Sequence, residues 1–105
     1  MKHVIEISKV LGYVNTPEGE RELCATADAR YDEPRGHLVV RLDSFLRTTE
    51  LTVREQHVKE PWLPAPETVV ETVALEESME LARDIFHRWV RKVRDTAPVM
   101  HLQPA

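Results

Sequence analysis

The sequence predicts an α+β fold, in which an antiparallel sheet of about five strands is followed by one long C-terminal helix. The first observation is that apolar and polar residues alternate with a period of two along several stretches before Leu75. The second is that after Leu75 the apolar residues recur with the period of about 3.6 that is typical of a helix. A chain in which a run of strands precedes a helix belongs to the α+β class.

Two strands are expected at residues 4–14 and 23–31. In the second of them one face carries apolar residues and Tyr31, whereas the other carries Cys24, Thr26, Asp28 and Arg30. Such alternation is typical of an antiparallel sheet with one buried face. Residues 16–20 and 32–36 each combine proline with glycine and are therefore expected to form turns.

Further strands are expected at residues 38–43, 51–55 and 69–75. A turn near residues 46–49 is inferred only from length, because residues 38–58 are too long for one typical strand. Residues 60–66 contain three prolines, which lack the amide hydrogen that a central strand needs. This segment is therefore predicted to be a loop.

The helix is expected over residues 76–95. Acidic residues are concentrated in its first half and basic residues in its second half, which complements the helix dipole. Pro98 is expected to end it. We therefore expect a single domain at residues 1–97 and a flexible tail at 98–105. The apolar stripe of the helix consists of Met79, Ala82, Phe86, Trp89 and Val93, flanked by Leu81, Ile85 and Val90.

This stripe is wider than a helix lying on a sheet usually needs, which is about 100° of arc. One helix also leaves the second face of the sheet uncovered, so that face is either polar or covered by a ligand or a second subunit. These observations predict a homodimer formed through the helix, with Phe86, Trp89 and Val93 in contact with the partner.

Composition limits the possible functions. The chain has 105 residues, of which 42% are hydrophobic and 30% charged, with a formal net charge of −4. Domains that hold nucleic acid by bulk charge are usually strongly basic, so this mechanism is not expected here. The single cysteine excludes an internal disulfide and fits a reducing compartment. No run of 18 apolar residues occurs and a carboxylate appears early, so we expect a cytoplasmic protein without a signal peptide.

No catalytic motif is present. The five histidines form no HExxH or similar metal-ligand pattern, although His37 and His57 are candidates to meet on neighbouring strands. Cys24 lies on a predicted strand, where a small apolar role is expected rather than that of a nucleophile. We therefore expect no enzymatic activity, no metal and no cofactor.

Trp62 lies between prolines in the predicted loop. An aromatic residue in such a loop can contact a base or a partner protein. It can equally close one end of the core, and the sequence leaves both alternatives open.

Residues 45–85 resemble the positive cofactor four family of transcriptional coactivators, whose members bind single-stranded DNA. The resemblance runs over about two fifths of the chain without a gap. It rests on Phe45, Leu51, Val53, Arg54 and Glu55, and then on Val73, Leu75, Glu76, Leu81 and Ile85. It implies a four-stranded antiparallel sheet with a C-terminal helix, paired into a dimer by that helix, and a groove for single-stranded DNA on the curved sheets.

The resemblance also implies the nucleic-acid contacts, which fall here on Phe45, Arg47, Arg54, His57 and Lys59. The sequence departs from the family at two places. A Lys-Gly-Lys turn is replaced by residues 46–48 (Leu-Arg-Thr), and an aromatic pair is replaced by residues 56–57 (Gln-His). The strands at residues 4–31 are an addition to the family core.

Two functions follow as hypotheses. The first is a small non-enzymatic binding or regulatory protein for single-stranded nucleic acid. The alternative is a protein-interaction or assembly subunit with no nucleic-acid role. The alternative is favoured by the acidic charge, by the Pro-Trp-Leu-Pro segment at residues 61–64, and by the equal numbers of acidic and basic residues in the helix.

Overall fold

The computed structural model describes residues 1–48, 57–98 and 101–102. Three long strands form an antiparallel meander: β1 (Lys2–Thr16), β2 (Gly19–Asp32) and β3 (His37–Thr48). The outer edge of β3 pairs with β5 (Glu67–Thr72) at one end and with the short β4 (His57–Val58) at the other. The helix α1 (Leu75–Thr96) completes the α+β fold and confirms the predicted fold class.

The strands predicted at 4–14, 23–31 and 38–43 are confirmed, and each is longer than the alternation alone indicated. The strand expected at 51–55 lies outside the described residues. The strand expected at 69–75 occupies Glu67–Thr72, because the chain enters the helix at Leu75. In the segment expected to be a loose tail, β6 (His101–Leu102) pairs with β1 at Gly12 and Tyr13.

The turns predicted at residues 16–20 and 32–36 join strands of the meander. The turn inferred near residues 46–49 was wrong for residues 46–48, which continue β3. Two residues separate Thr16 from its register partner Gly19, which has a φ of 117°. Four residues separate Asp32 from His37, and the last of them, Gly36, has a φ of 65°. Glycine adopts these positive φ values without the steric cost that a side chain would add. The loop lengths therefore set the register of β2 against both neighbours.

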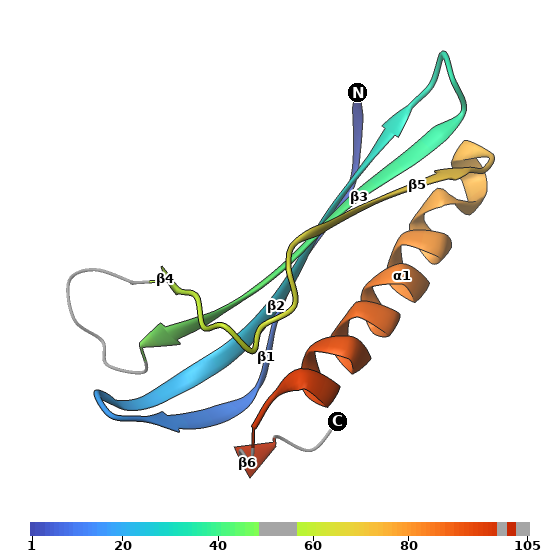
Figure 1. Cartoon of the computed structure of the whole chain (residues 1–105). Coiled ribbons are helices and arrows are strands. Elements are labelled where there is room, and N and C mark those ends of the chain that lie inside the picture. The colour runs from blue at the N-terminus through green and yellow to red at the C-terminus, as the bar shows by residue number, and fades with distance from the viewer. Residues whose placement is uncertain (49–56, 99–100, 103–105) are drawn as a thin grey trace.

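The helix lies along one face of the sheet, and the opposite face carries no helix among the described residues (Figure 1). Three alanines of β2, namely Ala25, Ala27 and Ala29, are buried in the same core cluster as the inward residues of α1. Small side chains on a strand leave room for large ones on the helix that crosses it. The buried helix residues are Ser78, Ala82, Ile85, Phe86, Trp89, Val90 and Val93.

The residues predicted to contact a second copy are therefore core residues of a single chain. Phe86, Trp89 and Val93 are 3%, 2% and 0% exposed, and they belong to one cluster with the inward face of the sheet. Met79, which the periodicity placed in the stripe, is exposed instead. The width of the stripe is accounted for by the chain's own sheet, and the homodimer stays a prediction.

Ser44 is buried on β3, and within the described part of the chain its hydroxyl has no hydrogen-bond partner. A buried polar group without a partner lowers stability. Ser44→Ala is therefore expected to leave the free energy of unfolding unchanged or to raise it by up to about 1 kcal/mol, measured by urea denaturation.

The matched control is Ser78→Ala. Ser78 is also buried, but its hydroxyl donates a hydrogen bond to the Leu75 carbonyl oxygen at 2.7 Å. Its loss is expected to lower the free energy of unfolding by about 0.5–1.5 kcal/mol. If Ser44→Ala lowered the free energy of unfolding more than Ser78→Ala does, the Ser44 hydroxyl would have a hydrogen-bond partner in solution.

Candidate functional site

The face of the sheet away from α1 is called the open face here. Side chains alternate between the two faces of a strand, and register partners share a face. Because Leu38, Val40 and Leu42 lie in the core that α1 shares, Val39 and Arg41 lie on the open face. The other open-face residues with which the site is concerned are Glu6, Ser8 and Val10 of β1; Glu22, Cys24, Thr26, Asp28 and Arg30 of β2; Asp43, Phe45 and Arg47 of β3; and Thr68 and Val70 of β5.

One end of the open face carries an aromatic pair. The rings of Phe45 and His57 stack with their centroids 3.9 Å apart and their planes 16° from parallel. Phe45 is 7% exposed, whereas His57 is exposed. His57 is held there because β4 pairs it with Arg47. The imidazole is therefore the ring that this end presents to solvent.

The cations at this end are held by carboxylates. The Nε and Nη2 atoms of Arg47 donate hydrogen bonds to Oε2 of Glu22 at 3.0 and 2.5 Å, and both side chains are about three-quarters buried. The Lys59 ammonium donates to the Asp43 carboxylate and to the Ser44 carbonyl oxygen. A phosphate that binds here has to compete with these carboxylates.

The structure thus brings together Phe45, Arg47 and His57, which the sequence proposed as nucleic-acid contacts. Lys59 lies next to them, on Asp43. Arg54 lies outside the described residues. Trp62 is half-buried and packs against the core cluster from the loop before β5.

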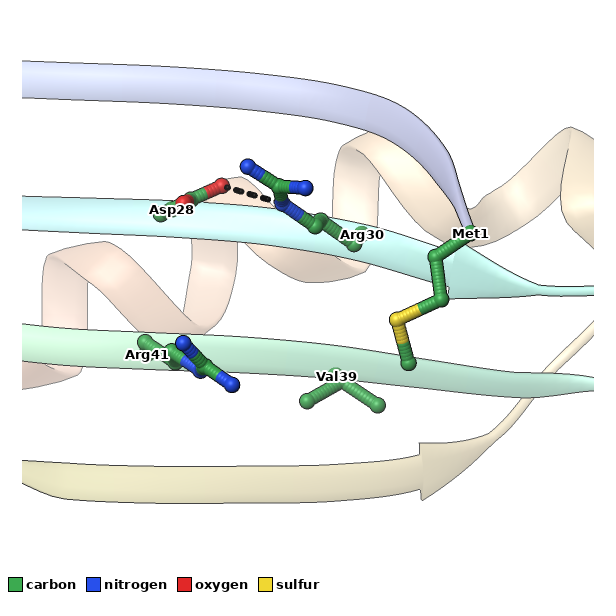
Figure 2. Close-up of a pocket in the computed structure, with 5 residues that line it drawn as sticks. All are labelled: Met1, Asp28, Arg30, Val39 and Arg41. Carbon is green, nitrogen blue, oxygen red and sulfur yellow. Dashed lines mark hydrogen bonds and ion pairs between the residues drawn. The ribbon is translucent and has the colours of Figure 1, made fainter.

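The open face has a second cationic group at its other end, which the sequence reasoning missed. Arg30 and Arg41 line one hollow of about 220 Å³, together with Met1, Asp28 and Val39 (Figure 2). Alternation places Arg30 and Arg41 on polar faces of their strands, but only the register of β2 against β3 brings the two faces together. The sequence signal that could have found them is the presence of arginines at outward positions of two adjacent predicted strands.

An adjoining hollow of about 450 Å³ crosses the middle of the sheet and shares Asp28 and Arg41 with the first. Its floor includes the small side chains of Ser8 and Thr26, which are register partners. Three acidic residues of the open face line it, namely Glu6, Asp28 and Asp43. Glu67 also belongs to its lining, but the Glu67 carboxylate pairs with Lys92 of α1. The two hollows therefore differ in charge, the smaller being cationic and the larger acidic.

The residues weighed for catalysis are not brought together. His37 pairs with Thr72 and His57 pairs with Arg47, so their positions along β3 are separated by about 33 Å of strand. Cys24 is fully buried. Among residues 1–48, 57–98 and 101–102, no three histidine, cysteine or carboxylate side chains are grouped so that they could hold a metal ion.

The chain matches no protein-family model, no curated protein and no solved structure. The antiparallel sheet with one C-terminal helix is what the structure supports of the architecture implied by the sequence resemblance.

Within the described residues, no helix combines the length and the apolar character that a membrane span requires.

Proposed function

We propose that this chain is a non-enzymatic binding module that binds single-stranded nucleic acid along the open face of its sheet. One observation carries the proposal: the sheet face that α1 leaves uncovered holds three arginines and a stacked aromatic pair. These residues are Arg30, Arg41 and Arg47, with Phe45 and His57. The order of long antiparallel strands followed by a helix also agrees with what the resemblance to the positive cofactor four family implies.

The aromatic pair supplies a stacking surface. A base that stacks on an aromatic side chain contributes about 1–3 kcal/mol, and the interaction tolerates any base because each has a flat face. His57 is the exposed ring, and Phe45 supports it from below at a centroid distance of 3.9 Å. A supported ring is ordered before the base arrives, so less entropy is lost on binding.

The charges predict weak and salt-dependent binding. Arg30 and Arg47 each form an ion pair with a carboxylate on the same face, Asp28 and Glu22 respectively. Phosphate contacts made by such groups weaken as salt rises, since binding releases counterions from the nucleic acid. Glu22 competes with phosphate for Arg47, so removing its charge is expected to strengthen binding.

Fluorescence anisotropy of a labelled oligothymidine at low salt tests the proposal. We expect binding that weakens as salt is raised. His57→Ala is expected to lower affinity by about 5- to 150-fold, which is the contribution of one stacked base. Glu22→Gln is expected to raise affinity. The matched control is His87→Ala, because His87 is an exposed histidine on α1, away from the open face.

Absence of binding at tens of micromolar protein would overturn the proposal, as would binding that does not respond to salt. An equal effect of His57→Ala and His87→Ala would show that the contact does not lie on the open face.

The alternative function is a protein-interaction or assembly subunit. It is favoured by the ion pairs that already neutralise Arg30, Arg47 and Lys59, and by Val70, which is 55% exposed on the edge strand β5. Capture of a partner that survives nuclease treatment and is lost in Trp62→Ala would favour this alternative. Capture that is abolished by nuclease would favour nucleic acid.

A further inference from the structure

At the end of the open face farthest from His57, two arginines line one hollow, and the Arg30 guanidinium is turned toward Asp28 (Figure 2). Arg30 of β2 and Arg41 of β3 are diagonal neighbours, because Arg41 is the register partner of Asp28 and Arg30 that of Val39. Both line the hollow of about 220 Å³. Figure 2 shows the two arginine side chains on the same side of the sheet, with the Met1 side chain reaching toward Val39.

The hollow carries a net positive charge in a chain whose formal charge is −4. Among the described residues that line it, Asp28 is the one carboxylate, and it accepts a hydrogen bond from Nε of Arg30 at 3.4 Å. Arg41 is exposed and forms no ion pair with any described residue. The charged side chains among the described residues that line the hollow are thus one carboxylate and two guanidinium groups, which sum to one positive charge.

This chemistry favours a phosphate group. Guanidinium presents a planar fork of donors that matches the oxygens of phosphate. Arg41 offers one such fork, and that of Arg30, which is hydrogen-bonded to Asp28, lies on the adjacent strand. Met1 and Val39 supply apolar contact beside it. The volume is below the roughly 300–1,000 Å³ of pockets that enclose a whole drug-sized ligand, so the hollow suits one phosphate and the group attached to it.

We propose that Arg30 and Arg41 form a phosphate-binding subsite on the open face. The adjoining larger hollow is disfavoured as its location, because the acidic residues Glu6, Asp28 and Asp43 line it together with Arg41 and would repel an anion. The inference rests on the proposed function only for the source of the phosphate, which is the backbone of a bound strand or a free phosphate or nucleotide. Arg41 and Arg47 are separated by about 20 Å along β3, so one extended strand can reach both the subsite and the aromatic pair.

The test is an NMR titration of the full chain that follows the arginine Nε–H signals and the His57 ring signals. The probes are inorganic phosphate, thymidine monophosphate and oligothymidine, each compared with sodium chloride at equal ionic strength. We expect phosphate to shift the Arg30 and Arg41 signals and to leave Arg88, an exposed arginine on α1, unchanged. Arg41→Gln is expected to weaken phosphate binding at least tenfold, and Asp28→Asn is expected to strengthen it.

Arg41→Lys separates geometry from charge, since it keeps the positive charge and loses the fork. An intermediate affinity supports the proposal, whereas an affinity equal to that of Arg41→Gln or to that of the unchanged chain contradicts the role of the fork. Equal shifts at Arg41 and Arg88 would overturn the subsite by showing that phosphate acts as a general counterion.

The outcomes distinguish this inference from the proposed function. If oligothymidine shifts the His57 signals and leaves Arg30 and Arg41 unmoved, the subsite is refuted while the nucleic-acid function stands. If phosphate or thymidine monophosphate shifts Arg30 and Arg41 and oligothymidine does not bind, the subsite stands with a free phosphate compound as its ligand, and the nucleic-acid function is refuted.

Discussion

Trp89→Ala is expected to lower the free energy of unfolding by about 3–5 kcal/mol, as the loss of a buried tryptophan usually does. The indole is 2% exposed, and its Nε1–H donates a hydrogen bond to the Asp43 carbonyl oxygen at 2.8 Å. The substitution removes apolar contact between α1 and the sheet and leaves that carbonyl without the donor. Because small domains are stable by only about 5–15 kcal/mol in total, urea denaturation followed by circular dichroism will show a large shift.

Two variants separate the lost apolar contact from the lost hydrogen bond as causes of the destabilisation. Trp89→Phe keeps most of the apolar contact and loses the donor, so a loss of about 1–3 kcal/mol is expected. Trp62→Ala removes a tryptophan that is only half-buried, and a smaller loss than for Trp89→Ala is expected. If Trp89→Ala cost no more than Trp62→Ala, the packing of α1 on the sheet would be refuted.

The same measurement tests the predicted homodimer. A protein stabilised by association with a second copy unfolds at a midpoint that rises with protein concentration. A core role for Trp89 within one chain predicts that the loss caused by Trp89→Ala does not depend on concentration. If the loss of unfolding free energy caused by Trp89→Ala grew with protein concentration, Trp89 would instead be a contact between two copies of the chain.

Ala27→Leu is expected to lower the free energy of unfolding by about 1–3 kcal/mol, because added methylene groups in a packed core force neighbours from their preferred positions. Ala27 is 1% exposed at the centre of β2 and belongs to the cluster that contains Phe86 and Trp89. The measurement is again urea denaturation, with far-ultraviolet circular dichroism to verify that the native secondary structure is retained.

The matched control is Thr26→Leu, which alters the neighbouring residue on the open face. Thr26 is half-buried and lines the larger hollow, so the leucine has room, and a change within about 0.5 kcal/mol is expected. Equal losses for the two variants would show that α1 does not distinguish the two faces of β2.

Much of the fold was predictable from the sequence because the signals that specify it are local. The alternation in residues 23–31 placed Ala25, Ala27 and Ala29 on one face and Asp28 and Arg30 on the other, as the structure has them. The helix expected at residues 76–95 extends over Leu75–Thr96, and its end before Pro98 follows from the backbone restriction that proline imposes on the residue before it.

The candidate site was predictable only in part. Phe45, Arg47 and His57 were named from the sequence, yet their contact depends on β4 pairing with β3, which no local pattern specifies. Arg47 pairs with Glu22, which lies 25 positions earlier on β2, and this pairing also needs the register of β2 on β3.

The sequence by itself determined the order of the elements and the face on which each strand residue lies, because periods of two and about 3.6 arise from the backbone geometry of one segment. The tertiary structure decided which segments lie side by side. It covered the helix stripe with the chain's own sheet, and it placed Arg30 beside Arg41 at one end of the open face and His57 over Phe45 at the other. The physical reason is that register depends on turn lengths and on packing between distant residues, which alternation along one strand does not encode.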